Sequence, residues 1–229
     1  MHITPYINYN IKTKKMRNKF INKIFIITLG LIFTLTILVL TIPRLGYEMV
    51  NDGYSVLGSF GINPNIYISK THFNKPIVEI GVRAFENKRI DSFTFEQDSN
   101  VEKISRRSFY NTKLRYIEIP SSVRIIEQNA FSYSTIEEIN INGNNLEAIS
   151  GSTFFNCTNL KSIVIPTSVE SIGSLAFFNC INLKDIYINN KLKIFDKAFY
   201  GCDITIHTKC PLELLSGYDT NANIKIVYD

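Results

Sequence analysis

One short motif recurs six times in this chain and constrains its fold more than any other feature of the sequence. In each copy a small residue precedes a phenylalanine, and an isoleucine stands five residues before that phenylalanine. The phenylalanines are Phe85, Phe109, Phe131, Phe154, Phe177 and Phe199, with spacings of 24, 22, 23, 23 and 22 residues. A repeat of such constant length predicts a solenoid, in which each unit packs only against its neighbours.

Each repeat also contains an alternating pair of apolar residues that predicts a β-strand. Residues i and i+2 of a strand face the same side, and isoleucine fills most of these positions. The pairs are Phe93 and Phe95, Ile117 and Ile119, Ile139 and Ile141, Ile163 and Ile165, Ile186 and Ile188, with Ile204 and Ile206 as a shortened last copy. Stacked in parallel about 4.8 Å apart, these strands would form one main sheet over a continuous core. A shorter second strand is expected at the aliphatic column that contains Val101 and Val123.

The segments on either side of the solenoid, which we assign to residues 77–206 as about six units, are predicted to cap its ends. The N-terminal cap, residues 44–76, contains Asn51-Asp52-Gly53, a sequence typical of a hairpin turn. Ile66-Tyr67-Ile68 follows and alternates like a first strand.

The C-terminal cap is predicted to comprise residues 207–229. Pro211 to Tyr218 reads as a short helix that begins with proline, and Ile224 to Tyr228 reads as a closing strand.

An uncharged, largely apolar run from Ile24 to Ile42 precedes the caps and predicts a transmembrane helix that acts as a signal anchor. At 1.5 Å per residue it spans roughly 28 Å, close to the hydrocarbon thickness of a bilayer, and Pro43 ends it. Residues 1–23 carry six Lys and Arg and no acid, so the positive-inside rule places this tail in the cytoplasm and the repeats outside. A cleaved signal peptide is the alternative, although no Ala-x-Ala-like site follows the run. A buried helix of a soluble protein is disfavoured by the length of the run and its cationic flank.

The net charge of +5 arises from this tail. Residues 43–229 hold 19 Lys and Arg against 20 Asp and Glu. This balance does not favour binding to nucleic acid, because such binding depends on basic residues that neutralise phosphates.

The repeat unit can be written as aliphatic, Ile-Gly, small, Phe, Cys, Leu, Ile-x-Ile-Pro. Its fullest copy contains Ile172-Gly173, Ala176-Phe177, Cys180 and Leu183. The pattern resembles that of the BspA-like leucine-rich-repeat surface proteins of bacteria and some protists, over roughly residues 47–229. The resemblance implies a mainly β leucine-rich-repeat solenoid with a parallel sheet.

The first three copies depart from this pattern, because Lys88, Thr112 and Ser134 stand where the family has cysteine. Members of the family are similar to adhesins and recognition proteins, many of them secreted or wall-bound. The resemblance implies no common catalytic residues.

Cys157, Cys180 and Cys202 each stand three residues after a repeat phenylalanine, so the solenoid places them in one column. They are interpreted as buried small apolar residues, with a disulfide between neighbouring rungs, or between Cys202 and Cys210, as the alternatives. The sequence has no Cys-x-x-Cys, and His207 is the one histidine near the column, so no metal or cofactor is predicted. His2 lies in the tail, His72 before the first repeat and His207 at the last strand, so no catalytic set assembles from neighbouring rungs, and we predict that the chain is not an enzyme.

The alternation of the main strands identifies their outward residues without any motif. Those predicted to contact a ligand are Tyr116, Glu118, Glu138, Asn140, Val164, Asp185 and Tyr187. Tyrosine offers apolar area and a hydroxyl, which suits a protein or glycan ligand. A plain solvated sheet is the alternative.

These features predict a single-pass, membrane-anchored cell-surface protein whose repeats bind a macromolecule in adhesion or recognition. The alternative is a membrane-tethered spacer or assembly subunit that binds no foreign ligand.

Overall fold

The computed structural model describes residues 26–28, 44–51, 53–60, 64–209 and 222–228 of the chain. By its internal contacts the chain divides into two units, one of residues 1–42 with 61–63 and one of the remaining residues. In the first unit the described residues are Ile26 to Thr28, which are helical. None of the helical residues that the structure describes belongs to a helix long and apolar enough to cross a membrane. The rest of the predicted span, the basic tail and the predicted helix from Pro211 to Tyr218 lie outside the described residues.

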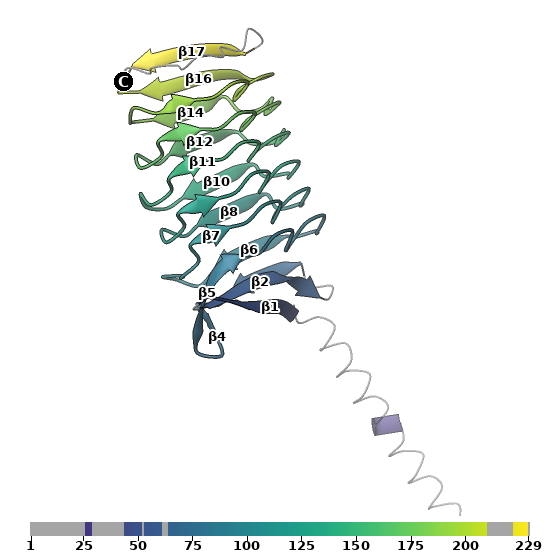
Figure 1. Ribbon diagram of the computed structural model, residues 1–229. Helices are drawn as coiled ribbons and strands as arrows, with labels where there is room; N and C mark the ends of the chain where they lie inside the picture. Colours follow the sequence, from purple (N-terminus) through teal and green to yellow (C-terminus); the bar gives the residue numbers. More distant parts are fainter. Residues whose placement is uncertain (1–25, 29–43, 52, 61–63, 210–221, 229) are drawn as a thin grey trace, which may run out of the picture. The chain divides into compact units, whose positions relative to one another are not determined.

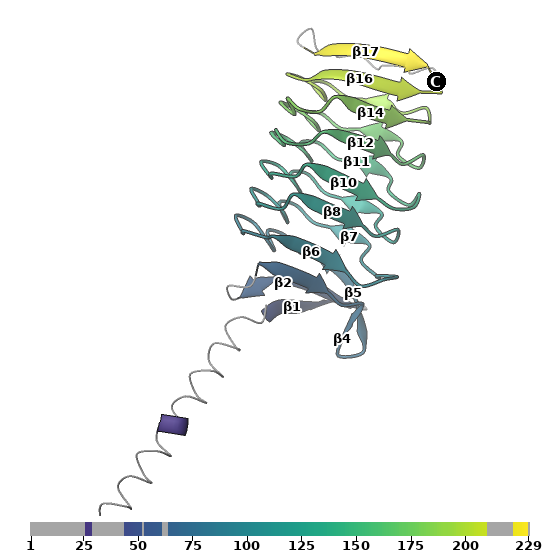
Figure 2. The same cartoon turned by 180° about the vertical axis from the view of Figure 1, so that it is seen from behind.

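The second unit is a solenoid built almost wholly from parallel strands (Figure 1). Its long strands are β3 (Asn65–Ile68), β6 (Ser92–Phe95), β8 (Tyr116–Ile119), β10 (Glu138–Ile141), β12 (Ser162–Ile165), β14 (Asp185–Ile188), β16 (Asp203–Thr208) and β17 (Asn223–Tyr228). Its short strands are β7 (Lys103–Ile104), β9 (Ile125–Ile126), β11 (Ala148–Ile149), β13 (Ser171–Ile172) and β15 (Lys193–Ile194). Figures 1 and 2 show the long strands stacked on one side and the short strands on the other.

The register of the long strands repeats from rung to rung, but their pairing is interrupted between β6 and β8 and between β10 and β12, so the predicted single main sheet is divided into three. Ile139 lies opposite Ile117, and Ile163 opposite Ile186, so like residues form columns as predicted. The short strands pair in the same way, with Ile104 opposite Ile126. They lie at the isoleucine column and not at the Val101 and Val123 column predicted for them. Val123 closes the turn that begins at Pro120, because its backbone N–H donates to the Pro120 carbonyl, and β9 begins two residues later. Val101 likewise lies two residues before β7.

The six repeat phenylalanines form a buried stack through the middle of the solenoid, which confirms the central prediction. Successive ring centroids lie 5.0–5.6 Å apart, with planes within 16° of parallel. The backbone supports the stack, because the N–H of Phe131 donates to the carbonyl of Thr153, the residue before the next phenylalanine. Isoleucine columns from both sheets complete one apolar core.

The turns that hold this stack contain two residues with positive φ in every repeat. They lie two residues before and two residues after each phenylalanine, as Arg107 and Asn111 do around Phe109. Asparagine occupies the second position in four repeats and glycine in the last, and both residues tolerate this conformation. This positive φ was not predicted, although the asparagine that recurs two residues after the phenylalanine indicates it.

The N-terminal cap is a hairpin of β1 (Arg44–Val50) and β2 (Gly53–Phe60), paired antiparallel as predicted. β2 then pairs in parallel with β5 (Lys75–Ile80), which continues into the short-strand sheet through β7. β3 pairs with β6 as a first long strand, again as predicted. At the other end β17 pairs in parallel with β16 and confirms the closing strand.

Candidate binding face

The candidate site is the outward face of the long-strand sheet, where each strand presents two side chains to solvent. All seven residues predicted from the alternation lie on this face, on β8, β10, β12 and β14. Three of them carry exposed apolar area: Tyr116 is 45% exposed, Val164 60% and Tyr187 38%. The face therefore combines apolar area with polar side chains.

Hydrogen bonds between rungs hold several of these polar groups in place. Asn140 Nδ2 donates to the Tyr116 hydroxyl over 3.3 Å, and Asn142 Nδ2 donates to Glu118 Oε1 over 2.9 Å. At the other end of the face, His207 Nε2 lies 2.9 Å from Asp185 Oδ1, and its ring stacks on Tyr187 at a centroid distance of 4.6 Å. Side chains fixed in this way lose less conformational entropy when a partner binds.

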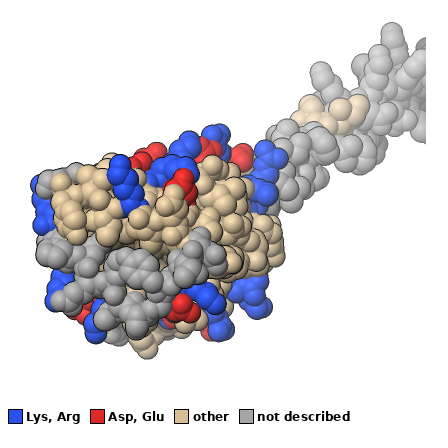
Figure 3. Space-filling model, turned by 90° about the horizontal axis from the view of Figure 1, so that it is seen from above, with Lys and Arg blue, Asp and Glu red and all other residues tan. Residues whose placement is uncertain are grey.

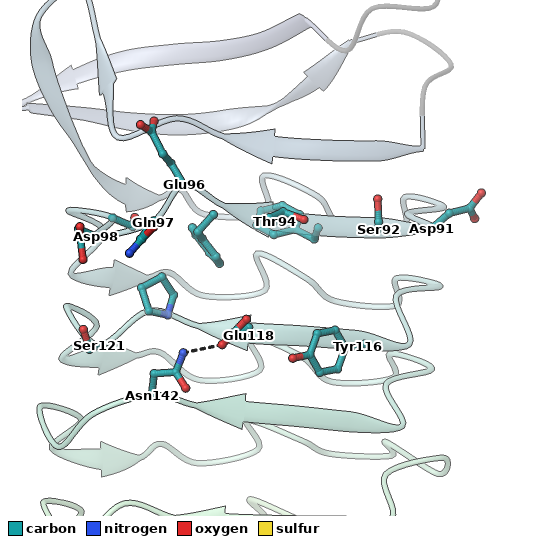
Figure 4. Close-up of a pocket in the computed structure, with 14 residues that line it drawn as sticks. Asp91, Ser92, Thr94, Glu96, Gln97, Asp98, Tyr116, Glu118, Ser121 and Asn142 are labelled. Atoms are coloured by element: carbon teal, nitrogen blue, oxygen red, sulfur yellow. Dashed lines mark hydrogen bonds between the residues drawn. The ribbon is translucent and has the colours of Figure 1, made fainter.

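The face is hollowed between β6 and β8, where the two strands do not pair. A cavity of about 500 Å³ lies there, and its lining includes Thr94, Phe95, Asp98, Tyr116 and Glu118. Figure 4 shows Glu118 bonded to Asn142 on one side of this hollow and the labelled residues of β6 and its following loop on the other. The hollow thus brings two predicted residues, Tyr116 and Glu118, next to a loop that the sequence analysis did not single out.

The loop after β6 is longer than the corresponding loop after β8. Six residue steps lead from Phe95 at the end of β6 to Val101, whereas four lead from Ile119 at the end of β8 to Val123. The backbone N–H of Lys70 donates to Glu96 Oε2 over 2.7 Å, which ties the longer loop to the preceding rung. The sequence signal was the Phe85 to Phe109 spacing, the longest of the five.

An ion-pair ladder runs beside the face across three rungs. Glu137 accepts hydrogen bonds from Arg115 Nε and from Lys161 Nζ, the latter over 2.7 Å. Two hydrogen bonds, the stronger effect from Arg115 and the weaker from Lys161, lower the pKa of Glu137 from 4.5 to about 2. Viewed along the stack, positive and negative side chains are interspersed around the rim (Figure 3). The ladder thus cross-links rungs without creating a patch of one sign.

The lowered pKa of Glu137 predicts a pH dependence. The Glu137 carboxylate stabilises the fold fully above its unfolded pKa of about 4.5, and this stabilisation is lost as the pH falls towards about 2. We expect Glu137→Gln to lower the Tm slightly near neutral pH, and the difference from wild type to shrink to nothing by about pH 2. Thermal unfolding, followed by circular dichroism at several pH values across this range, measures the difference in Tm between variant and wild type. Glu138→Gln, at the neighbouring outward residue, is the control and should show no such convergence.

The three cysteines of the column are buried, and none forms a disulfide in the structure. The thiol of Cys157 donates to the carbonyl of Phe131 over 3.0 Å, and Cys180 and Cys202 donate in the same way to Phe154 and Phe177. Burial raises the pKa of Cys157 to about 12 and that of Cys202 to about 11, and it raises the pKa of Cys180 as well. Such thiols are poor nucleophiles and poor metal ligands at neutral pH. Cys210 lies outside the described residues.

A comparison with family models decides the classification. Residues 65–205 match six copies of the BspA type leucine rich repeat region. The chain belongs to this family. No curated protein matches the BspA-type chain.

Three solved structures share the fold of this BspA-type chain. A leucine rich cell surface protein from Faecalibacterium prausnitzii is 22% identical with a TM-score of 0.55, over 72% of this chain and 48% of its own. The T. pallidum leucine rich repeat protein is 21% identical with a TM-score of 0.53, over 74% and 80%. The pneumococcal vaccine antigen PcpA is 17% identical with a TM-score of 0.54, over 72% and 62%. The match thus spans about half of the Faecalibacterium protein, and at these identities it shows the fold alone.

Proposed function

We propose that the outward face of the long-strand sheet binds a protein outside the cytoplasm. The observation that carries this proposal is the exposure of Tyr116, Val164 and Tyr187 on the outward face of the stacked long strands, within the part of the chain that the structure describes. Tyrosine is enriched at protein interfaces because it adds apolar area and a hydroxyl at low entropic cost. The repeats offer area for recognition, and their buried thiols do not support a catalytic role.

A protein suits this face better than a glycan. One face of the Tyr187 ring is covered by His207, which leaves less aromatic surface for a sugar to stack on. The Tyr116 hydroxyl and the amide of Asn140 already pair with each other, which leaves fewer free polar groups for sugar hydroxyls. The hollow beside β8 adds depth, and its carboxylates at Asp98 and Glu118 complement a basic side chain of the partner.

The proposal includes an anchor at the cell surface. Residues 24–42 have the length and composition of a membrane-spanning helix, and the basic tail before them would remain in the cytoplasm. The chain enters β1 of the N-terminal cap at Arg44, so this cap would follow the membrane span almost directly. The Faecalibacterium protein of the same fold is described as a cell surface protein, which supports this placement.

Site-specific photo-crosslinking on cells that display the full-length chain tests the binding face. A photoreactive residue replaces Val164 on the proposed face or, as a matched control, Ile125, which is 45% exposed on the short-strand sheet. We expect the Val164 position to cross-link a distinct protein that the Ile125 position does not reach. Equal products at both positions would contradict the proposal, and products that contain only copies of this chain would favour a structural spacer.

A further inference from the structure

A small hairpin at the N-terminal end of the solenoid carries the most exposed large hydrophobic residue of the described ranges. β4 (Thr71–His72) pairs antiparallel with the start of β5, and Phe73 and Asn74 form the two-residue turn between them. Phe73 is 82% exposed. Figures 1 and 2 both show this hairpin extending past β1, away from the stacked rungs.

Phenylalanine is a costly residue at this turn. Phe73 and Asn74 have φ values of 46° and 60°, a conformation that favours Asn and Gly and is unusual for a bulky side chain. The exposed ring gains little burial within the described chain to offset this strain. A residue that is both strained and exposed indicates a contact made outside the chain.

The base of the hairpin is held firmly. The ring of His72 stacks on Tyr47 of β1 at 3.8 Å and meets the edge of Tyr54 of β2 at 4.9 Å. These contacts hold the hairpin against the cap.

The surroundings of the tip have the chemistry of a membrane interface. Met49 on β1 is 57% exposed, and Lys75 Nζ lies 3.9 Å from its sulfur. The hairpin from Thr71 to Lys75 contains one lysine and no acid. Aromatic and aliphatic side chains beside a lysine favour the boundary between acyl chains and headgroups, most of all where the lipids are anionic.

The course of the chain indicates which surface the hairpin meets. β1 is the last strand at this end of its sheet, and it begins at Arg44, two residues after the apolar run ends at Ile42. β1 is roughly 20 Å long, at about 3.3 Å per residue step, so the hairpin, which packs on Tyr47 of this strand, lies within about 20 Å of the start of β1. The membrane is thus within reach of both points.

We propose that the tip formed by Phe73, with Met49 and Lys75, inserts into the headgroup region of the membrane that holds residues 24–42. This inference rests on the anchor of the proposed function. A second attachment within about 20 Å of the first would restrict the tilt of the cap, and with it the range of directions in which the binding face points.

Tryptophan fluorescence tests the contact cleanly because the chain contains no Trp. The full-length chain is reconstituted into vesicles of phosphatidylcholine and phosphatidylglycerol with bromines placed near the headgroups or near the bilayer centre. We expect Phe73→Trp to emit at shorter wavelength in vesicles and to be quenched by the bromines near the headgroups. Phe195→Trp, at a residue 48% exposed beside β15, is the control and should not be quenched. Phe33→Trp, within the apolar run, reports the anchor through quenching at the bilayer centre.

The outcomes separate the two claims. Quenching of Trp at position 33 but not at position 73 overturns the membrane contact and leaves the anchor standing. Quenching at neither position means that the anchor itself is wrong. A shift to shorter wavelength at position 73 without quenching indicates a protein contact or a second copy, and also overturns the inference.

A second variant separates membrane contact from a folding role. Asparagine suits this turn, so Phe73→Asn should preserve or raise the Tm in detergent. On vesicles the same variant should increase the mobility of the repeats. Fluorescence anisotropy of a dye on the cap measures this mobility. A Tm at least 5 °C below wild type would show that Phe73 serves folding and would overturn the proposal.

Discussion

Phe131→Ala is expected to cost about 3–5 kcal/mol of unfolding free energy, the usual range for removing a fully buried phenylalanine. Phe131 is 0% exposed and stacks between Phe109 at 5.0 Å and Phe154 at 5.6 Å. The cavity would interrupt the core at mid-solenoid, where each rung depends on its neighbours. The two halves should then unfold in separate steps, visible as a broadened or biphasic urea transition by circular dichroism.

Phe195→Ala provides the matched control for this experiment. Phe195 is 48% exposed and outside the stack, so its removal should change the stability by less than about 0.5 kcal/mol. If Phe131→Ala lay within about 1 kcal/mol of wild type, the phenylalanine stack would not be the core of the fold.

Gly58→Ala is expected to destabilise the N-terminal cap by about 3 kcal/mol through strain and overlap together. Gly58 has a φ of 137°, and an added Cβ would overlap the backbone carbonyl oxygen of Ala84 in the first repeat. It follows Leu57, the extra residue of a bulge that the register between β1 and β2 reveals. Hydrogen exchange should show faster exchange in β1 and β2 while the later rungs keep their protection.

Gly201→Asn is the control for positive φ without overlap. Gly201 has a φ of 75°, but an added Cβ would meet no atom closer than 3.5 Å. In four other rungs the equivalent residue is an asparagine with φ between 51° and 60°. The variant should therefore be close to neutral, and equal damage from both variants would contradict the argument from overlap at Ala84.

The sequence predicted those features in which the same type of side chain recurs in every repeat. The spacing of the phenylalanines predicted the stack, and the isoleucine pairs predicted both the long strands and their outward residues. Apolar burial is strong enough to be read from pattern alone, because one misplaced rung would expose its whole apolar face. The outward positions of Tyr116, Val164 and Tyr187 followed from the same alternation.

Features that depend on backbone geometry were not predicted. The positive φ of Arg107 or Leu175 leaves no mark in residue type, since neither residue favours that conformation. The hollow beside β8 lies next to the loop after β6, which is two residues longer than the loop after β8. The spacing from Phe85 to Phe109 shows that this repeat is longer, but it does not show where in the repeat the extra residues lie. The turn at Phe73 was not predicted because phenylalanine is an unusual residue at positive φ. Such a departure from the usual residue choice points to a functional contact rather than to a requirement of the fold.

The most direct test of the binding face is the affinity of the full-length chain for the protein that cross-links at Val164. The double variant Tyr116→Ser/Tyr187→Ser removes two exposed aromatic side chains from the face without touching the core. Because tyrosine is enriched among the interface residues whose truncation costs about 1 kcal/mol or more, we predict that Kd rises at least about tenfold while the variant keeps a cooperative thermal unfolding transition. The matched double variant Ile125→Ser/Tyr133→Ser, at exposed residues outside the face, should leave Kd unchanged. An unchanged Kd for the first variant, or an equal loss for both, would contradict the account.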